Sequence, residues 1–475
     1  MRFYFALFCC LFIGCGSSNS STSGCKVDTE CKGDRICVDG DCVSPTTDGG
    51  SSDAGSSGSD GDVIEVNDDG GGSGGDVGTD TGTDTGSDDG AECPGLINER
   101  PAALSEHAGI FDPVNQRIVF HGGNPEFPVQ CFGKNSYVPE TWAYWPKCKQ
   151  WELLGTDGPS PRGRSAAVYD SGRHAMFLFG GRFRPKGADM NIPYTLYDET
   201  WWLDLKSHKW SKIKAKGDVP QARVSASAIY DPVDERVIMF GGNQSTGGAS
   251  YIPLNDLRSF DVLSAEWKML TPAHQGPSKR LFAAAVYDSK RHAMILTTGG
   301  DQQAFTGPFL GDTWSLDLTT LTWTQLHKGG GNAPARRIWG RAVYSATRDR
   351  VIMFGGHDDG ALGNRNDLWQ FNIENKNWEL IQMNDTFNKP SNGFCDFPAD
   401  FANIVEGTPE RRSAHLLVYW EAENSLLVHA GKTDCGQIDD VWQLDLSDHS
   451  WTDLEGAGVG EVCLRISDEC SSLCN

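Results

Sequence analysis

Short apolar runs separated by turn residues occupy most of the chain between about residues 100 and 454. The unit that starts at Arg162 is typical: its first run ends at Asp170, its second ends in Gly180-Gly181, and two more follow a loop. The same four runs return in the same order in six copies. Runs of about five residues bounded by Gly, Pro, Asn and Asp are typical of strands. The pattern therefore predicts an all-β fold of six similar units.

Landmark residues keep the six copies in register. A di-glycine follows the second run of five copies, and Ala430-Gly431 replaces it in the sixth. These di-glycines begin at Gly122, Gly180, Gly241, Gly299 and Gly355. A tryptophan follows the third run at constant spacing, at Trp151, Trp210, Trp267, Trp323, Trp378 and Trp451. The constant spacing predicts hairpins of one length, and the tryptophans are expected to bury large areas between neighbouring units.

A period of about fifty to sixty residues with a di-glycine after the second strand resembles the kelch repeat. The resemblance covers Pro101 to about Leu454. It implies a six-bladed kelch-type β-propeller, in which each repeat forms one blade of four antiparallel strands around a central channel. We assign this propeller to residues 93–475, with a Cys-rich tail from about residue 456.

The first residues have the composition of an export signal. Arg2 precedes an apolar run from Phe3 to Gly14, which is too short to span a bilayer. The run ends at Cys15 in Phe-Ile-Gly-Cys, which resembles a bacterial lipobox and implies lipidation of Cys15. Residues 1–15 are then the signal segment and 16–24 a tether, and the protein is expected at the outer membrane or cell surface of a Gram-negative bacterium. An ordinary signal peptide that is cut elsewhere is the alternative.

Two further segments separate this signal from the repeats. Residues 25–43 have little to bury and carry four cysteines, Cys25, Cys31, Cys37 and Cys42. We expect a small knot with two disulfides of open connectivity, because the CxxC spacing of a zinc site is absent. Residues 44–92 are rich in Gly, Ser and Asp and predict a disordered acidic linker. The formal net charge of −23 argues against nucleic acid as a partner.

An arginine precedes the first strand in five copies, at Arg162, Arg223, Arg280, Arg337 and Arg412, and Leu104 replaces it in the first copy. In a propeller these arginines would form a ring near the channel mouth, where they could bind acidic sugars or other carboxylates. An acid also precedes the third strand of each copy, at Glu140, Glu199, Asp256, Asp312, Asp367 and Asp440. Pairing of these acids with the arginines is the structural alternative, which we favour.

Four histidines occupy matching positions in the first and last copies, which become neighbours when a ring closes. They are His107, His121, His415 and His429. A cluster of imidazoles can bind zinc or copper, so the four are candidate metal ligands. Other copies hold Phe179, Phe240 or Phe354 at the second position, which favours packing in the core. We therefore predict no metal and no cofactor.

The loops after the di-glycines differ in length and carry aromatic residues. By strand direction they project from the arginine face, and variable loops on a rigid scaffold are where binding usually resides. We predict exposed aromatics for stacking on a sugar or a protein, with packing inside the loops as the alternative. The candidates are Phe127, Phe132, Tyr137, Phe183, Tyr194, Tyr197, Tyr251, Phe305 and Phe309.

The cysteines of the propeller predict disulfides. Cys395 and Cys435 lie in neighbouring loops of one face and are expected to pair. Cys93 precedes the first blade, and three cysteines follow the sixth, at Cys463, Cys470 and Cys474. At least one bond between these two ends is expected to staple the ring. The partner of Cys148 stays open.

The sequence contains no nucleophile elbow, zinc-protease motif or phosphate loop. Some kelch propellers are enzymes, including galactose oxidase and a sialic acid epimerase, but a fold alone does not assign a reaction. The sequence therefore favours a non-catalytic, monomeric recognition module of the cell surface that binds a protein or a glycan through the variable loops. An exported carbohydrate-modifying enzyme of the epimerase or oxidase class is the alternative.

Overall fold

The computed structural model describes residues 93, 99–126, 136–188, 192–247, 250–304, 307–358, 363–383, 385–386, 405, 407–433 and 436–457. For residues 36–38, 41–43, 387, 402–403, 465–466 and 469–470 it describes the backbone alone. The chain divides into two units, Met1–Gly86 and Ser87–Asn475. In the first unit β1 (Ile36–Val38) and β2 (Asp41–Val43) form an antiparallel hairpin whose backbone register places Cys37 opposite Cys42.

Six antiparallel sheets of four consecutive strands make up the second unit. Blade one contains β3 (Ala108–Asp112), β4 (Arg117–His121), β5 (Thr141–Trp145) and β6 (Gln150–Gly155). Blade two contains β7 (Ala166–Asp170), β8 (Ala175–Phe179), β11 (Thr200–Asp204) and β12 (Lys209–Ile213). Blade three contains β14 (Ser227–Asp231), β15 (Arg236–Phe240), β16 (Leu257–Asp261) and β17 (Glu266–Leu270).

The other three blades repeat this plan. Blade four contains β18 (Ala284–Asp288), β19 (Ala293–Gly299), β20 (Leu310–Asp317) and β21 (Thr322–His327). Blade five contains β23 (Arg341–Ser345), β24 (Arg350–Asp358), β25 (Asn364–Asn372) and β26 (Asn377–Gln382). Blade six contains β29 (Leu416–Trp420), β30 (Ser425–Lys432), β31 (Gln437–Asp445) and β32 (Trp451–Glu455).

Short elements complete the second unit. They are β9 (Arg182–Phe183), β10 (Thr195–Leu196), β13 (Lys216–Gly217), β22 (Arg337–Ile338), β27 (Thr386–Phe387), β28 (Ala402–Asn403), the 3₁₀ turn η3 (Glu421–Glu423), β33 (Arg465–Ile466) and β34 (Glu469–Cys470). In the part of the chain that is described, no helix has the length and apolar character needed to cross a membrane.

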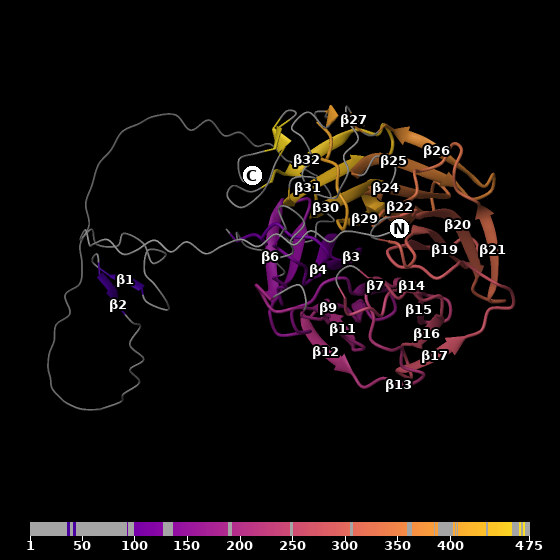
Figure 1. Cartoon of the computed structure of the whole chain (residues 1–475), viewed down its shortest axis with the longest axis horizontal. Coiled ribbons are helices and arrows are strands. Elements are labelled where there is room, and N and C mark those ends of the chain that lie inside the picture. The colour runs from indigo at the N-terminus through magenta and orange to yellow at the C-terminus, as the bar shows by residue number, and fades with distance from the viewer. Residues whose placement is uncertain are drawn as a thin grey trace, which may run out of the picture. The chain divides into compact units, whose positions relative to one another are not determined.

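The blades close into a ring around a central channel (Figure 1). The first strand of each blade contacts the first strand of the next, in the order β3, β7, β14, β18, β23, β29 and back to β3. Each of these strands is hydrogen-bonded within its blade on one side only, so its free edge faces the channel. The prediction of a six-bladed, all-β propeller is confirmed.

The hydrophobic core lies between neighbouring blades in six separate clusters. Trp267 of blade three is fully buried against Phe177 and Phe179 of blade two, with its ring centroid 5.1 Å from that of Phe179. Its indole N–H donates to the hydroxyl of Thr200 in blade two at 3.1 Å. The landmark tryptophans therefore join each blade to the preceding one.

The sequence pattern places the di-glycine of blade four at Gly299-Gly300, which is one residue too late. Each blade-start arginine donates to the carbonyl of the residue eighteen positions later, which is Gly180 in blade two but Thr298 in blade four. The pair in blade four is therefore Thr298-Gly299, and not Gly299-Gly300. Thr298 adopts the same left-handed backbone as Gly180, with φ values of 62° and 73°. A Cβ on Gly180 would lie 2.5 Å from a carbonyl oxygen of the next blade, which explains the usual glycine.

Side-chain packing closes the ring between blades six and one. Leu416 and Trp420 share a buried cluster with Ile118 and Phe120. Cys93 forms a disulfide with Cys148, which lies in the turn between β5 and β6. The prediction that Cys93 bonds to the C-terminal cysteines is wrong, because this nearer thiol takes its place. The predicted bridges of Cys25, Cys31, Cys395 and Cys435 lie outside the described residues, as does the lipidation of Cys15.

Candidate functional site at the channel mouth

The five blade-start arginines are buried and paired with the acids of their own blades. The ion-pair distances are 2.7 Å for Arg162–Glu199 and Arg223–Asp256, 2.8 Å for Arg280–Asp312, 2.6 Å for Arg337–Asp367 and 2.5 Å for Arg412–Asp440. Each arginine also donates to a backbone carbonyl at the end of the second strand. Their guanidinium groups are thus engaged within the blades, as the structural alternative predicts.

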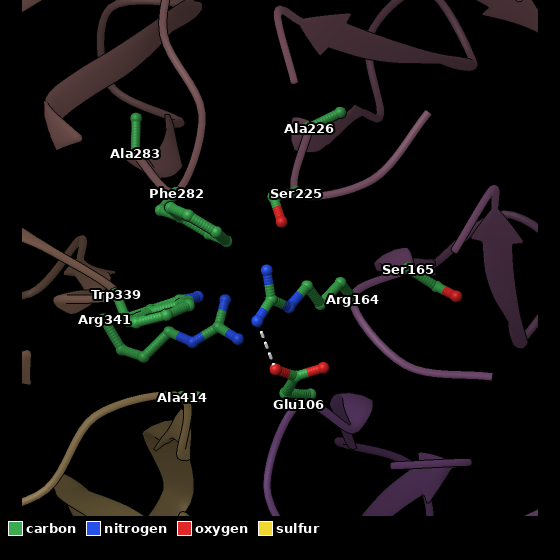
Figure 2. Close-up of a pocket in the computed structure, with 10 residues that line it drawn as sticks. All are labelled: Glu106, Arg164, Ser165, Ser225, Ala226, Phe282, Ala283, Trp339, Arg341 and Ala414. Atoms are coloured by element: carbon green, nitrogen blue, oxygen red, sulfur yellow. Dashed lines mark hydrogen bonds and ion pairs between the residues drawn. The ribbon is translucent and has the colours of Figure 1, made fainter. Parts of the chain in front are cut away.

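A different set of six residues surrounds the mouth of the channel, each two positions after a blade start. They are Glu106, Arg164, Ser225, Phe282, Trp339 and Ala414 (Figure 2). All six have left-handed backbones, with φ between 51° and 63°. Backbone hydrogen bonds of 2.8–3.2 Å link five of the six neighbouring pairs, as in Arg164 N–H to Glu106 C=O. The turn therefore aims one side chain from every blade at the channel axis.

Glu106 is the one carboxylate among these six residues. It accepts hydrogen bonds from Arg164 and from Arg182, the latter at 3.1 Å and 3.2 Å. Burial opposes ionisation of Glu106, but the two guanidinium charges outweigh this effect and lower its pKa to about 2. Glu106 therefore stays ionised and acts as a fixed counter-charge for the arginines.

Aromatic rings form the opposite side of the mouth. The guanidinium carbon of Arg164 lies 5.1 Å from the ring centroid of Phe282 and 5.1 Å from that of Trp339. Phe282 is buried, whereas Trp339 is half-buried. The mouth thus combines an ion pair with a cation–π contact, and both hold Arg164 in place.

The mouth opens into a channel with a cavity of about 160 Å³. At the position four residues after the blade start, the inner strands carry Ala108, Ala166, Ser227, Ala284, Arg341 and Leu416. Arg341 is the one charged residue among these six, and its guanidinium points toward that of Arg164 (Figure 2). Its Nε donates to the carbonyl of His415 at 2.9 Å. Burial without a nearby carboxylate lowers the pKa of Arg341 to about 10.

Comparison with known proteins agrees with this geometry. The model of the "KLHDC2/KLHL20/DRC7 Kelch-repeats domain" matches residues 171–397. This match and the two relatives described next support a kelch-repeat family for this chain. "Kelch domain-containing protein 10" of Xenopus laevis is 27% identical over 291 residues, which cover 59% of this chain and 65% of that protein. "Host cell factor 1" of Rattus norvegicus is 27% identical over 56% of this chain and 13% of its own length.

A solved structure shares the propeller fold with this chain. The "Structure of YjhT" has a TM-score of 0.54 and 16% sequence identity, and the match covers 75% of this chain and 99% of that one. At this identity the likeness concerns the fold alone. The chain spans 65%, less than two thirds, of the length of the kelch domain-containing relative from Xenopus laevis.

The loop aromatics of the propeller are less exposed than predicted. Tyr137, Tyr194 and Phe309 are buried, which contradicts their predicted exposure. Tyr194 lies under the guanidinium groups of Arg182 and Arg184, at 4.0 Å and 3.6 Å. These buried rings therefore pack beneath the residues of the mouth and support them. Phe183, Tyr197 and Tyr251 are half-buried, and Phe127, Phe132 and Phe305 lie outside the described residues.

The four candidate histidines of the propeller are core residues. His107, His121, His415 and His429 are all buried, and the rings of His107 and His429 lie 5.0 Å apart. Burial lowers the pKa of His107 and of His121 to about 3. Among the described residues, the one group of His, Cys, Asp and Glu close enough to share an ion is Asp231, Asp234 and His292. None of the four candidate ligands belongs to that group.

Sequence reasoning missed the residues of the mouth. It concentrated on the arginines that recur in five blades. These arginines recur because each forms a buried ion pair that supports its own blade. A signal was available, because the position two residues after the blade start holds a different residue type in every copy. Arg341 could also have been found, since it stands where three other copies have alanine.

Proposed function

We propose that this protein is a non-catalytic recognition module of the cell surface, which binds a protein or a glycan through the loop face and channel mouth of its kelch propeller. The observation that carries the proposal is the mouth itself. Six equivalent positions on a strictly repeated scaffold carry Glu, Arg, Ser, Phe, Trp and Ala. The kelch-domain relatives support a role in protein interaction at this general level.

The state of the titratable groups at the mouth favours recognition over catalysis. A general base needs a pKa near the working pH, whereas that of Glu106 is lowered to about 2 by Arg164 and Arg182. Burial raises the pKa of Tyr137, which keeps its hydroxyl protonated. In the described part of the mouth, these groups are suited to holding charge in place and not to transferring protons.

Site-specific photo-crosslinking in cells tests this proposal. A photo-reactive residue at Ser225 would lie in the mouth. One at Val233 would lie in the turn after the opposite end of β14, where 64% of the Val233 surface is exposed. We expect a specific adduct with a protein or glycan from position 225 and none from position 233. Equal labelling from both positions would contradict recognition at the mouth.

The alternative function is an exported carbohydrate-modifying enzyme of the epimerase or oxidase class. A glycan array with the purified protein, followed by mass spectrometry and NMR of each bound glycan, separates the two functions. Recovery of unchanged glycan supports a recognition module. Conversion of the glycan by wild-type protein would replace it with the enzyme.

We further propose that Cys15 carries the lipid anchor that holds the propeller at the outer membrane. The apolar run before Cys15 and the Gly/Ser residues after it support this role. Cys15→Ser should move the protein from the membrane fraction to the soluble fraction, because the acyl chains supply the anchoring. Cys9→Ser, within the apolar run, is the matched control and should stay membrane-bound. Membrane retention of the Cys15→Ser protein would contradict the anchor.

A further inference from the structure

Arg341 differs from the other arginines around the channel. The five blade-start arginines, Arg164 and Arg182 each have a carboxylate partner. Arg341 has none among the residues that the structure describes. Its Nε donates to the His415 carbonyl, and both terminal nitrogens have no acceptor within the described chain. The guanidinium is half-buried, and its two terminal nitrogens keep their N–H groups available to a ligand.

The charges at the mouth are not balanced. Glu106 is the sole carboxylate among the described residues that line the mouth, and it forms ion pairs with Arg164 and Arg182, whereas Arg341 lines the same pocket without an ion pair to it. Arg341 and Arg164 moreover point toward one another across the opening (Figure 2). Two guanidinium groups that face each other repel unless an anion lies between them. The local positive charge stands out in a chain whose formal net charge is −23.

The channel provides room for a small ligand beside Arg341. Its cavity of about 160 Å³ compares with an engineered cavity of about 150 Å³ that accepts benzene. The room exists because four of the other five blades carry Ala or Ser where Arg341 stands in blade five. Ser165, Ala226 and Ala283 line both the mouth and the channel, so the cavity is continuous with the opening. Its volume suits a small ion and excludes a folded segment.

We propose that the mouth binds a small oxyanion, a carboxylate or a phosphate, between the guanidinium groups of Arg341 and Arg164, where the mouth joins the channel cavity. This deepens the proposed recognition function, on which it rests, by giving the chemical class of one ligand group. Planar guanidinium forks bind such oxygens in pairs of charge-assisted hydrogen bonds. Arg164 is already oriented by Glu106 and the aromatic rings, and Arg341 by the His415 carbonyl.

Anion titrations of the full chain test this assignment. Sodium acetate and sodium phosphate are titrated at constant ionic strength by calorimetry, with acetamide as the uncharged analogue of acetate. Arg341→Ala is the test variant, because three other blades have alanine at this position and should tolerate it. Arg336→Ala is the control, because it removes the same charge from an exposed site five residues away on the same chain.

We expect acetate or phosphate to bind the wild type and Arg336→Ala equally, and to bind Arg341→Ala at least about tenfold more weakly. Binding of acetate alone identifies a carboxylate site, and binding of phosphate alone identifies a phosphate site. Equal binding by Arg341→Ala, equal binding of acetamide, or no binding of either anion would overturn the assignment. Such a failure leaves the crosslinking result at Ser225 unaffected, so it is distinguishable from failure of the recognition function.

Discussion

At the scale of single residues, position in the blade decides what an arginine does. Arg337 precedes the first strand of blade five, and its guanidinium is fully engaged in a buried ion pair with Asp367. Arg164 lies two residues after a blade start and is shared between Glu106 and two aromatic rings. Arg341 lies four residues after a blade start and faces the channel. Three identical side chains therefore serve the blade, the mouth and the cavity.

The buried pairs are expected to contribute strongly to stability. Asp367→Ala leaves the fully buried Arg337 without its partner and should lower the free energy of unfolding by about 3–5 kcal/mol. Urea denaturation measures this change. The control is Glu423→Ala, which breaks the exposed pair with Lys147 and should cost less than about 1 kcal/mol. Similar costs for both variants would show that the buried pairs do not support the blades.

At the scale of elements, the seam between two blades is the unit that buries apolar surface. Each cluster of the core combines strands of two neighbouring blades, and a tryptophan of one blade covers the strands of the one before. The seam between blades six and one keeps its tryptophan, Trp151, but differs in a residue that this tryptophan packs against. His429 stands there at the position that holds Phe179 in blade two, and neither of its ring nitrogens has a partner among the described residues.

This seam is expected to make the propeller sensitive to acid. Burial holds the pKa of His429 well below its usual 6.5, with smaller effects from His107 and Arg412. Below about pH 6.5, His429 takes up a proton in the unfolded chain but stays neutral in the native protein. The free energy of unfolding is therefore unaffected by His429 above pH 6.5 and falls as the pH drops below it. At pH 5 the loss amounts to about 2 kcal/mol for this residue.

His429→Phe should therefore remove part of the pH dependence of unfolding between pH 7 and pH 5. Urea denaturation at the two pH values measures the change. His274→Phe replaces an exposed histidine and should leave the pH dependence as it is in the wild type. If His429→Phe loses as much stability at pH 5 as the wild type does, His429 is not the source of the acid sensitivity.

At the scale of the whole molecule, closure of the ring depends on packing and not on a shared strand. Every blade is built from one continuous stretch of the chain, and blade six meets blade one through Leu416, Trp420 and Phe120. Arg100 adds ion pairs of 3.0 Å to Asp439 and 3.1 Å to Glu455. The disulfide does not join blade one to blade six. Cys93 precedes blade one and Cys148 lies within it, 55 residues later.

This disulfide should stabilise the N-terminal side of the propeller without holding the ring closed. Cys93→Ser with Cys148→Ser should lower the free energy of unfolding by about 2–4 kcal/mol. The reason is that the disulfide closes a loop in the unfolded chain and so lowers the conformational entropy of that chain. Thermal unfolding followed by circular dichroism measures the loss. The variant should still show the native β signal below its midpoint. Loss of that signal in the folded range would mean that the bond is needed for closure.

The sequence alone determined the repeated architecture, because strand length, turn residues and tryptophan spacing are local properties that recur six times. It also predicted the partners of the blade-start arginines, since each pair forms within one repeat. It could not assign Cys93 to Cys148 or bury Tyr194, because those contacts depend on how loops fold back onto the blades.

Only the tertiary structure decided where the candidate site lies. Glu106, Arg164, Phe282 and Trp339 come from different blades and are far apart in the chain. They meet because the ring brings the same turn of every blade to one axis, and the left-handed backbone of that turn aims each side chain inward. A single repeat gives no sign of this convergence. The physical reason is that the channel belongs to the closed ring and to no blade by itself.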